Sequence, residues 1–266
     1  MRNYKKTSIL KKKSKADIVG FFDSVASRRN SLFLNNKIVG YEQQVRSKSV
    51  LEMLDVKPLD FVLDLGCGNG RDLIELSNQN FDNFLGIDIS PEMISEAKKE
   101  LVLRKIDAKK VQVGSATNLY FPDNTFDKII ASEVIEHIPD YGKAITEMRR
   151  VLKNNGYLII TTPNRNSWYG IDNFVYRLVL KVFNRENKHP YDEWKNFSEL
   201  KKLLESTGFK ILEVRGACYI PGFLFTYRAP DAVKKIIIFC VSKIELKMSK
   251  FLPKNGYMLC VKAKKI

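Results

Sequence analysis

The sequence has no apolar run long enough to cross a membrane and no cysteine pattern typical of zinc or disulfide proteins. Crossing a bilayer takes about 18 consecutive apolar residues, and no stretch of the 266-residue chain reaches this length. The four cysteines, at positions 67, 218, 240 and 260, have neither metal-binding nor paired spacing. The basic N-terminus lacks the apolar stretch of a secretory signal. These absences argue against a membrane-spanning chain and a disulfide-stabilised secreted domain, and they favour a reducing cytoplasm.

Acidic residues are few relative to basic ones. The chain has 45 Lys and Arg against 30 Asp and Glu, which gives a net charge of +15. Seven of the first fifteen residues are basic, and lysines are again frequent between positions 234 and 265. Such clusters attract phosphate-bearing surfaces, either nucleic acid or anionic lipid. A solvated tail is the alternative, and we expect residues 1–15 to form a flexible basic tail.

An alternation of strand and helix patterns organises the middle of the chain. It predicts an α/β fold with a parallel sheet, helices on both faces, and a ligand at the carboxyl ends of the strands. Apolar stripes within 16–55 predict a helical segment that covers or flanks this ligand site. Strands are expected at 61–65, 83–88, 110–114, 126–131 and 156–162, and helices at 70–78, 91–104 and 140–152, the last ended by Asn154–Asn155–Gly156.

Two insertions interrupt the expected core of residues 56–266, at about 164–196 and 217–253. Their aromatic residues either pack the insertions onto the core or line a pocket for a hydrophobic or ring-bearing acceptor. The second insertion also contains the apolar run 236–241 between lysines, a pattern that suits an anionic membrane surface. The aromatic residues are Trp168, Tyr169, Phe174, Tyr176, Phe183, Tyr191, Trp194, Phe223, Phe225 and Tyr227.

A glycine-rich turn follows the first expected strand. Three alternating glycines, Gly66, Gly68 and Gly70, tolerate positive φ and let the backbone approach a ligand closely. The helix that follows points its N-terminal amides at the same place. Asp88 ends the second expected strand, 22 residues after Gly66. This is close to the offset of about 20 residues at which an acid meets a ribose diol in nucleotide-binding units.

Six segments in this order resemble the class I S-adenosylmethionine-dependent methyltransferases. The likeness extends over roughly residues 41–216, and it implies a Rossmann-like sheet of seven strands, mostly parallel. One antiparallel strand is implied near the C-terminus, at about 257–264, beside a strand at 209–215. Glu-x-x-Glu-His followed by Thr-Pro-Asn is most similar to the branch of quinone O-methyltransferases and small-molecule methyltransferases. The segments are Asp64–Gly70, Gly86–Met93, Phe121–Asp127, Glu133–Asp140, Val151–Gly156 and Thr162–Asn164.

The resemblance implies S-adenosylmethionine as the cofactor. Asp64 would order the turn or meet the ammonium group through water, Asp88 would accept the ribose hydroxyls, and apolar side chains would hold the adenine. The implied cofactor-binding residues are Arg46, Asp64, Gly66, Gly68, Gly70, Asp88, Ile89, Met93, Ser115, Ala116, Ser132 and Glu133.

Three positions in this set need comment. Relatives usually carry an acid that accepts a hydrogen bond from the adenine amino group, whereas this chain has Ser115, an uncharged acceptor. Arg46, 20 residues before Gly66, matches an arginine that reaches the cofactor carboxylate, unless it is a surface residue of the covering helix. Arg71 stands where the dehydrogenase fingerprint needs its third glycine. The turn therefore favours the methyl donor over a dinucleotide.

Glu133, Glu136 and His137 form the polar cluster nearest the expected methyl group. At positions i, i+3 and i+4, one helical turn would present them together. Two carboxylates and an imidazole suit a divalent metal such as Mg²⁺, which the resemblance to the quinone branch also implies. Three roles stay open: metal ligands, His137 as the catalytic base, or structural hydrogen bonding. His189, the other histidine, either faces the acceptor or caps a turn.

These observations predict an enzyme that transfers a methyl group in line to an oxygen of a small, aromatic, sugar or lipid-linked acceptor. We expect a cytoplasmic protein, with peripheral contact to an anionic membrane as an option. An RNA methyltransferase is one alternative, motivated by the +15 charge. The Asn/Asp-Pro-Pro-Tyr/Phe motif of base N-methylating enzymes is absent after the fourth strand, which makes nucleic acid the less favoured partner. A cofactor-binding scaffold without catalytic activity is the other alternative.

Overall fold

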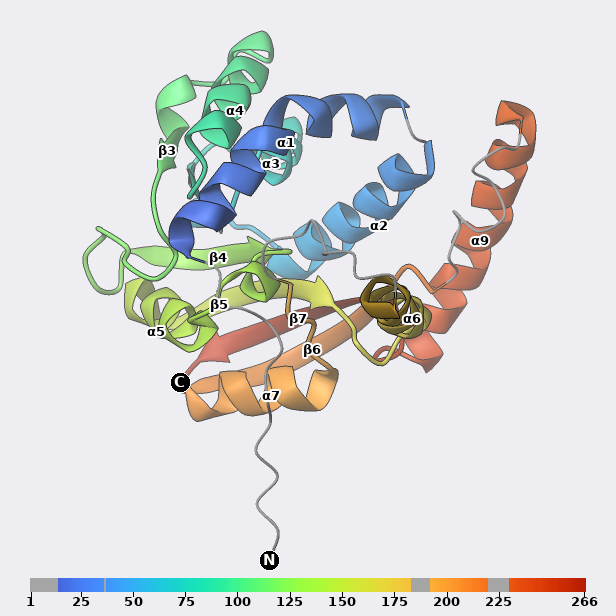
Figure 1. Ribbon diagram of the computed structural model, residues 1–266. Coiled ribbons are helices and arrows are strands. Elements are labelled where there is room, and N and C mark those ends of the chain that lie inside the picture. The colour runs from blue at the N-terminus through green and yellow to red at the C-terminus, as the bar shows by residue number, and fades with distance from the viewer. Residues whose placement is uncertain (1–13, 36, 183–191, 220–229) are drawn as a thin grey trace, which may run out of the picture.

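The computed structural model of the chain describes residues 14–35, 37–182, 192–219 and 230–266. Its centre is a seven-stranded sheet in the order β3-β2-β1-β4-β5-β7-β6 (Figure 1). β1 to β5 run parallel, and β7 runs antiparallel to both of its neighbours. The predicted fold class is therefore confirmed. The strands are β1 Val62–Leu65, β2 Phe84–Asp88, β3 Val111–Val113, β4 Phe126–Ser132, β5 Leu152–Pro163, β6 Phe209–Ala217 and β7 Met258–Lys265.

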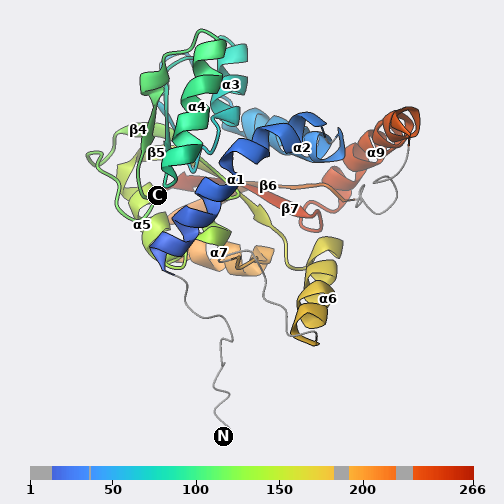
Figure 2. The ribbon, with the colours of Figure 1, turned by 45° about the horizontal axis from the view of Figure 1, so that its top comes forward.

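Helices cover both faces of the sheet (Figures 1 and 2). Side chains of α5 and α7 pack in the core on one face, and those of α2, α3 and α4 in the core on the other. The helices are α1 Lys15–Asn35, α2 Lys37–Leu54, α3 Arg71–Asn78, α4 Pro91–Leu103, α5 Tyr141–Val151, α6 Trp168–Val182, α7 Phe197–Ser206 and α9 Asp231–Phe251, with short 3₁₀ turns η1 Ala108–Lys110 and η2 Ile135–His137.

The central strands supply side chains to both halves of the core. Ile129 and Leu158 face α5 and α7, whereas their neighbours Ile130 and Ile159 face the other side, and all four are fully buried. Successive residues of a strand point to opposite faces, so a strand covered on both sides reads as a continuous apolar run. With both faces covered, the carboxyl ends of the strands are the place for a ligand.

The N-terminal helix α1 is docked on the start of α4. Ser90 caps α4, because its Oγ accepts a hydrogen bond from the Met93 amide at 3.0 Å. The same hydroxyl donates to the carboxylate of Asp23 on α1, which also accepts from the Glu92 amide at 3.3 Å. The helical segment expected at 16–55 is thus two helices, and the first of them shares a cap with the helix after β2.

The expected start of the fifth strand, at residue 156, is wrong. α5 ends at Val151, and Leu152 already has extended geometry, with φ −77° and ψ 133°. Leu152 is fully buried and pairs with Phe126 of β4. The strand therefore begins before Asn154–Asn155–Gly156, and this turn-like sequence lies inside β5. The register against β4 shifts there, and Asn155 has a φ of +64°.

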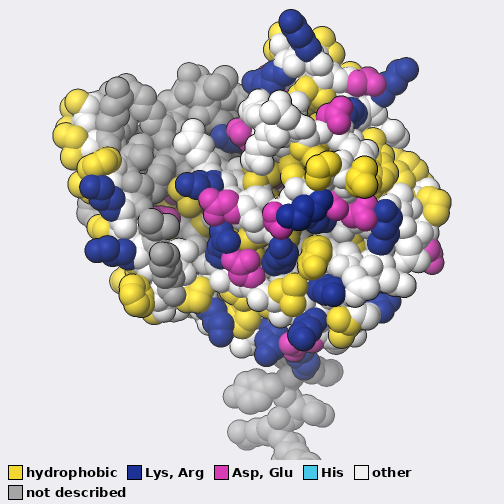
Figure 3. Space-filling view, turned by 180° about the vertical axis from the view of Figure 1, so that it is seen from behind, with side chains coloured by type: hydrophobic (Ala, Val, Ile, Leu, Met, Phe, Trp, Pro, Cys, Tyr) yellow, Lys and Arg dark blue, Asp and Glu magenta, His cyan; other side chains and the backbone are white. Residues whose placement is uncertain are grey.

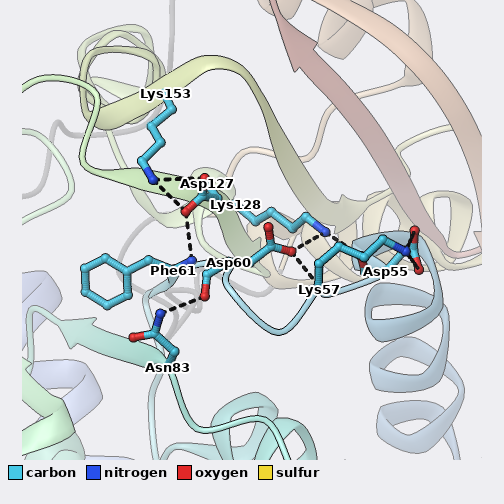
Figure 4. A network of polar contacts seen from close by, with 8 residues as sticks. All are labelled: Asp55, Lys57, Asp60, Phe61, Asn83, Asp127, Lys128 and Lys153. Atoms are coloured by element: carbon cyan, nitrogen blue, oxygen red, sulfur yellow. Dashed lines mark hydrogen bonds and ion pairs between the residues drawn. The ribbon is translucent and has the colours of Figure 1, made fainter.

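A polar network fixes the edge of the sheet opposite the ligand edge (Figure 4). The buried Lys128 forms an ion pair with Asp60, with 2.7 Å between Nζ and Oδ2, and donates to the main-chain oxygen of Asp55. The Phe61 amide donates to Asp127 Oδ2 at 2.9 Å. These contacts join the amino ends of β1 and β4, so we assign this network to stability.

Candidate functional site

A cavity of about 580 Å³ lies at the carboxyl ends of β1, β2 and β4. This is where ligands bind in open α/β sheets. The loops after β1, β2, β3 and β4 form its wall, together with Ile18 and Phe22 of α1 and Gln43 of α2. Gly70 and Glu136 are outside the lining. The predicted site residues that line it are Arg46, Asp64, Gly66, Gly68, Asp88, Ile89, Met93, Ser115, Ala116, Ser132, Glu133 and His137.

Each of the three positions in the turn requires glycine for a different structural reason. Gly66 has a φ of +74°, and an added Cβ would lie 2.4 Å from Val134 Cγ2. Gly68 has a φ of +52°, and an added Cβ would meet no atom within 4 Å, so its backbone faces open space in the cavity. At Gly70 a Cβ would lie 2.8 Å from Leu101 Cδ1 of α4. Gly68 is therefore the closest-approach glycine, and Gly70 allows helix packing.

Asp88 holds the turn in place from the end of β2. Its Oδ2 accepts a hydrogen bond from the Gly68 amide at 2.9 Å, and its Oδ1 accepts from the Ser90 amide at 2.9 Å. An ionised carboxylate has about four lone-pair sites. A carboxylate that lines the cavity can therefore accept bonds from ligand hydroxyls in addition to those from main-chain amides.

Arg46 lies at the base of the cavity and is only 6% exposed. The alternative of a surface arginine is therefore wrong. Its Nη1 lies 3.3 Å from Asp72 Oδ2, and Ser47 donates to the other oxygen of Asp72. Burial lowers the pKa of Arg46, but the charges of Asp72, Glu133 and Asp64 raise it above its ordinary value. The guanidinium thus stays charged in a buried position, where it can meet an anionic ligand group.

Asp64 places a carboxyl group in the same part of the cavity as Arg46. It is 2% exposed, and burial together with the charge of Asp72 raises the pKa of its carboxyl well above the ordinary value, while Arg46 opposes the rise. A cationic ligand group beside Asp64 would favour the ionised carboxyl. The cavity thus has two arginines, Arg46 and Arg71, and several carboxyl groups in its lining, which suits a ligand with both an anionic and a cationic group.

The wall after β2 and β3 is more apolar. Met93 is 1% exposed and lines the cavity with Ile89 and Ala116. Ser115 also lines it, and its hydroxyl lies 3.1 Å from that of Thr117. These residues provide an apolar slot with a small number of polar atoms at one end, the usual environment of a bound ring system.

The wall after β4 carries the predicted catalytic cluster. Glu133 has a φ of +58°, and its amide donates to the Thr161 carbonyl of β5 at 3.1 Å. The His137 ring packs edge-on against Phe22 of α1, with 5.3 Å between centroids. Ser132 Oγ is buried and has no hydrogen-bond partner among the described residues. The cavity thus has a polar wall after β4 that is partly covered by Phe22 of α1.

The predicted metal site at Glu133, Glu136 and His137 is not supported. Within the described ranges, no group of three or more His, Cys, Asp or Glu is placed to hold a metal ion. The left-handed backbone at Glu133 precedes the 3₁₀ turn of 135–137, so a single helical turn does not carry all three. Glu136 is 1% exposed and outside the cavity lining, whereas the other two residues line it. The three side chains therefore do not converge.

The carboxyl of Glu136 instead lies behind the cavity wall. Its Oε1 is 3.9 Å from Nε2 of His137, and neither oxygen has a hydrogen-bond partner in the part of the chain that the structure describes. Burial, followed by the charge of Glu133, raises the pKa of Glu136 well above its ordinary value. The nearby Thr162 hydroxyl lowers this pKa without making a hydrogen bond of normal geometry.

Sequence reasoning missed Asp72 and the α1 side of the cavity. Asp72 is 4% exposed and belongs to the buried face of α3 with Leu73 and Leu76. An acid on an apolar helix face needs a buried partner, so this pattern was an available signal for Arg46. Phe22 belongs to one of the apolar stripes within 16–55, but its contact with His137 depends on how α1 docks.

Some aromatic residues of the insertions are exposed to solvent, and others pack onto the core. Trp168 and Phe174 are 71% and 70% exposed. Tyr169 instead stacks on Tyr257 at 4.0 Å between centroids, and Trp194 lies 5.7 Å from the same ring. Several predicted positions lie outside the residues or side chains that the structure describes, namely residues 1–13, Tyr176, Phe183, His189, Tyr191, Phe223, Phe225 and Tyr227.

Comparison with known proteins decides the family. A family model described as a methyltransferase domain matches residues 57–208, more than half of the chain. The chain belongs to the class I S-adenosylmethionine-dependent methyltransferases. A demethylmenaquinone methyltransferase of Staphylococcus haemolyticus is 28% identical to this methyltransferase over 211 residues, which cover 73% of this chain and 86% of that protein. One from Staphylococcus aureus is 29% identical over 224 residues, covering 77% and 89%.

Solved structures show the same fold. A Thermotoga maritima S-adenosylmethionine-dependent methyltransferase, described as a possible histamine N-methyltransferase, superposes with a TM-score of 0.62 at 19% identity, covering 93% of this methyltransferase and 99% of that chain. The [4+2]-cyclase SpnF superposes with a TM-score of 0.57 at 20% identity, covering 82% and 79%. At these identities the likeness concerns the fold, which serves more than one reaction.

The residues of the cavity fit the cofactor of this methyltransferase. S-Adenosylmethionine has a carboxylate, an ammonium, a sulfonium and a ribose diol, and when bound it supplies an electrophilic methyl group. The backbone at Gly68 faces free space, so the chain can pass close to a ligand there. The combination of Arg46 with Asp64, Asp88 and Glu133 on one cavity matches the charges and hydroxyls of such a molecule.

Proposed function

We propose that the protein transfers a methyl group from S-adenosylmethionine to an oxygen of a small, ring-bearing acceptor. The observation that carries this proposal is the position of His137, whose imidazole lines the cavity between Phe22 and the polar wall after β4. A neutral imidazole can take the proton of an acceptor hydroxyl. The names of the staphylococcal relatives support an acceptor of the quinone type.

In this proposal the base of the cavity orients the cofactor. Arg46 binds its carboxylate, Asp64 its ammonium group, and Asp88 both ribose hydroxyls. The turn with Gly66 and Gly68 lets the main chain follow the amino-acid tail. The adenine lies against Ile89, Met93, Ser115 and Ala116, and the wall with Ser132 and Glu133 faces the sulfonium, all of which line the cavity.

The transfer step then needs alignment and one proton acceptor. S-Adenosylmethionine, when bound, would supply the methyl group, and His137 would take the proton that the acceptor oxygen gives up on methylation. Alignment of the reacting atoms can supply an effective molarity of about 10⁵ M or more. A positive charge on His137 would in turn favour ionisation of the Glu136 carboxyl, whose Oε1 lies 3.9 Å from His137 Nε2.

The test measures S-adenosylhomocysteine by mass spectrometry with quinols, catechols, sugars and short RNA as acceptors. A His137→Gln variant should keep the dissociation constant for S-adenosylmethionine within about threefold and lose at least about 100-fold in kcat, because general base catalysis contributes about 10² to 10⁴. A His137→Gln enzyme with undiminished kcat on the best acceptor would refute the proposed base.

Two other outcomes of this assay would favour a different function. Methylation of RNA with a steep loss of binding at rising salt concentration would favour the basic surface as a nucleic-acid site. Binding of S-adenosylmethionine without any S-adenosylhomocysteine would favour a scaffold or another reaction, as the fold shared with a [4+2]-cyclase allows.

A further inference from the structure

The exposed apolar side chains of the molecule are concentrated on two helices, α6 and α9. Of the 18 large hydrophobic residues that are exposed in the described part of the chain, ten belong to these two helices. On α6 they are Trp168, Ile171, Phe174, Leu178 and Val182, and on α9 Val233, Ile236, Phe239, Ile244 and Phe251. Single exposed apolar residues are normal on a soluble protein, but a concentration of this kind marks an interaction surface.

The exposed residues of α6 form one stripe. At about 100° per residue, positions 168, 171, 174, 178 and 182 fall within an arc of roughly 120°. The opposite side of the helix start is anchored: Tyr169 stacks on Tyr257, and its hydroxyl donates to Glu42 at 2.6 Å. α6 is therefore attached through one face and leaves an apolar face in contact with solvent.

α9 also has one anchored face and one exposed apolar face, and its exposed face carries lysines as well. Its exposed apolar residues span an arc of roughly 140°, and the exposed Lys243 and Lys247 fall inside this arc. Glu245 is on the far side of the helix, 6% exposed, and accepts hydrogen bonds from the amides of Cys218 at 3.1 Å and Tyr219 at 2.8 Å. The one acid of the helix interior is thus used for anchoring, and the solvent face is apolar and basic.

Both helices lie at the same end of the molecule (Figures 1 and 2). In Figure 3, this end shows hydrophobic side chains beside Lys and Arg. The sequence of α9 has five lysines and two acids, in a chain of net charge +15. No helix among the described residues is long and apolar enough to cross a bilayer, so this surface would lie on a membrane and not span it.

We propose that the exposed faces of α6 and α9 together form a docking surface for an anionic lipid bilayer. Apolar side chains enter the boundary between headgroups and acyl chains, as in interfacial amphipathic helices, while Lys243 and Lys247 bind lipid phosphates. The sequence motivated membrane contact only for the second insertion. The structure adds α6, whose exposed Trp168 and Phe174 belong to this surface rather than to an acceptor pocket.

The test is sedimentation of the full chain with vesicles of phosphatidylcholine and phosphatidylglycerol (3:1) in 50 mM NaCl, compared with pure phosphatidylcholine. It requires neither acceptor nor cofactor, so it is independent of the proposed methyl transfer. We expect binding to the anionic vesicles only. The variant Trp168→Ser/Phe174→Ser/Ile236→Ser/Phe239→Ser should weaken partitioning at least about tenfold, because each buried apolar side chain contributes several-fold.

Matched controls use exposed residues elsewhere. Leu59→Ser/Leu103→Ser removes side chains that are 92% and 76% exposed and should leave binding unchanged. Lys243→Glu/Lys247→Glu should weaken binding about 20-fold or more, at about fivefold per lysine, and Lys202→Glu/Lys210→Glu should not. Thermal unfolding and calorimetric binding of S-adenosylmethionine confirm that each variant is folded.

Two results would overturn the proposal. One is equal partitioning of the four-serine variant and the wild type. The other is a wild-type protein that ignores anionic vesicles but forms a dimer, by light scattering, that the four-serine variant does not form, in which case a second copy covers the surface.

Discussion

Replacing Asp88 by Asn should weaken both the proposed ribose contact and the support of the glycine turn. The carboxylate accepts hydrogen bonds from the Gly68 and Ser90 amides, both at 2.9 Å, and it lines the cavity. An amide side chain keeps one acceptor oxygen, so one of the two main-chain amides and one ribose hydroxyl lose a charged acceptor. Hydrogen bonds to charged groups contribute about 1.5 to 3 kcal/mol each. We therefore expect the affinity for S-adenosylmethionine to fall by about 2 to 3 kcal/mol, or roughly 30- to 150-fold.

The measurement is isothermal titration calorimetry at constant pH, with thermal unfolding of the free protein as a second readout. Asp107→Asn is a matched control, because Asp107 accepts a hydrogen bond from the Lys109 amide at 2.8 Å but lies outside the cavity. It should change stability by only a few tenths of a kcal/mol, because Asn caps a helix about as well as Asp, and it should leave the dissociation constant unchanged. An Asp88→Asn protein that binds within threefold of the wild type would refute the role of this carboxylate.

The remaining predictions concern stability. Because the folded-state pKa of Glu136 is raised, the folded state binds more protons than the unfolded state above about pH 4.5, and stability falls as pH rises toward the folded pKa. The melting temperature of Glu136→Gln minus that of the wild type should therefore increase as the pH rises from 5 to about 8. If this difference in melting temperature stayed constant over the range, the raised pKa of Glu136 would be contradicted. Lys128→Met leaves Asp60 unpaired at the amino ends of β1 and β4 and should lower the free energy of unfolding in urea by about 3 kcal/mol. Lys57→Met, which removes an ion pair of a 64% exposed lysine, should cost less than about 1 kcal/mol, and equal losses would argue against the role of burial.

The strands and the turn were predictable because their signals are local. Ile129–Ala131 is an apolar run with side chains in the core on both faces of the sheet, and such a run is typical of a buried parallel strand. Glycines in a turn indicate positive φ, which Gly66 and Gly68 adopt. Asp88 ends the next strand at the sequence distance from them that is typical of a ribose-binding acid. The ligand edge of the sheet follows from the order of these elements alone.

The errors come from contacts between distant residues or from unusual backbone angles. Asp72 was missed because its partner Arg46 lies 26 residues away in the sequence, and neither local sequence records this contact. The metal cluster was inferred from helical spacing, but Glu133 adopts a φ of +58°, which breaks that spacing. Asn154–Asn155–Gly156 looked like a helix end, although the pairing of Leu152 with Phe126 starts the strand earlier.

The docking of α1 has a consequence for how the cavity opens. Ser90 donates its hydroxyl hydrogen to Asp23 of α1, while its main-chain amide holds Oδ1 of Asp88. Phe22, next to Asp23 in the chain, closes the cavity against His137. Moving α1 away would therefore remove a partner of the serine that holds Asp88. We expect opening of this side of the cavity to be coupled to weaker support of the proposed ribose contact.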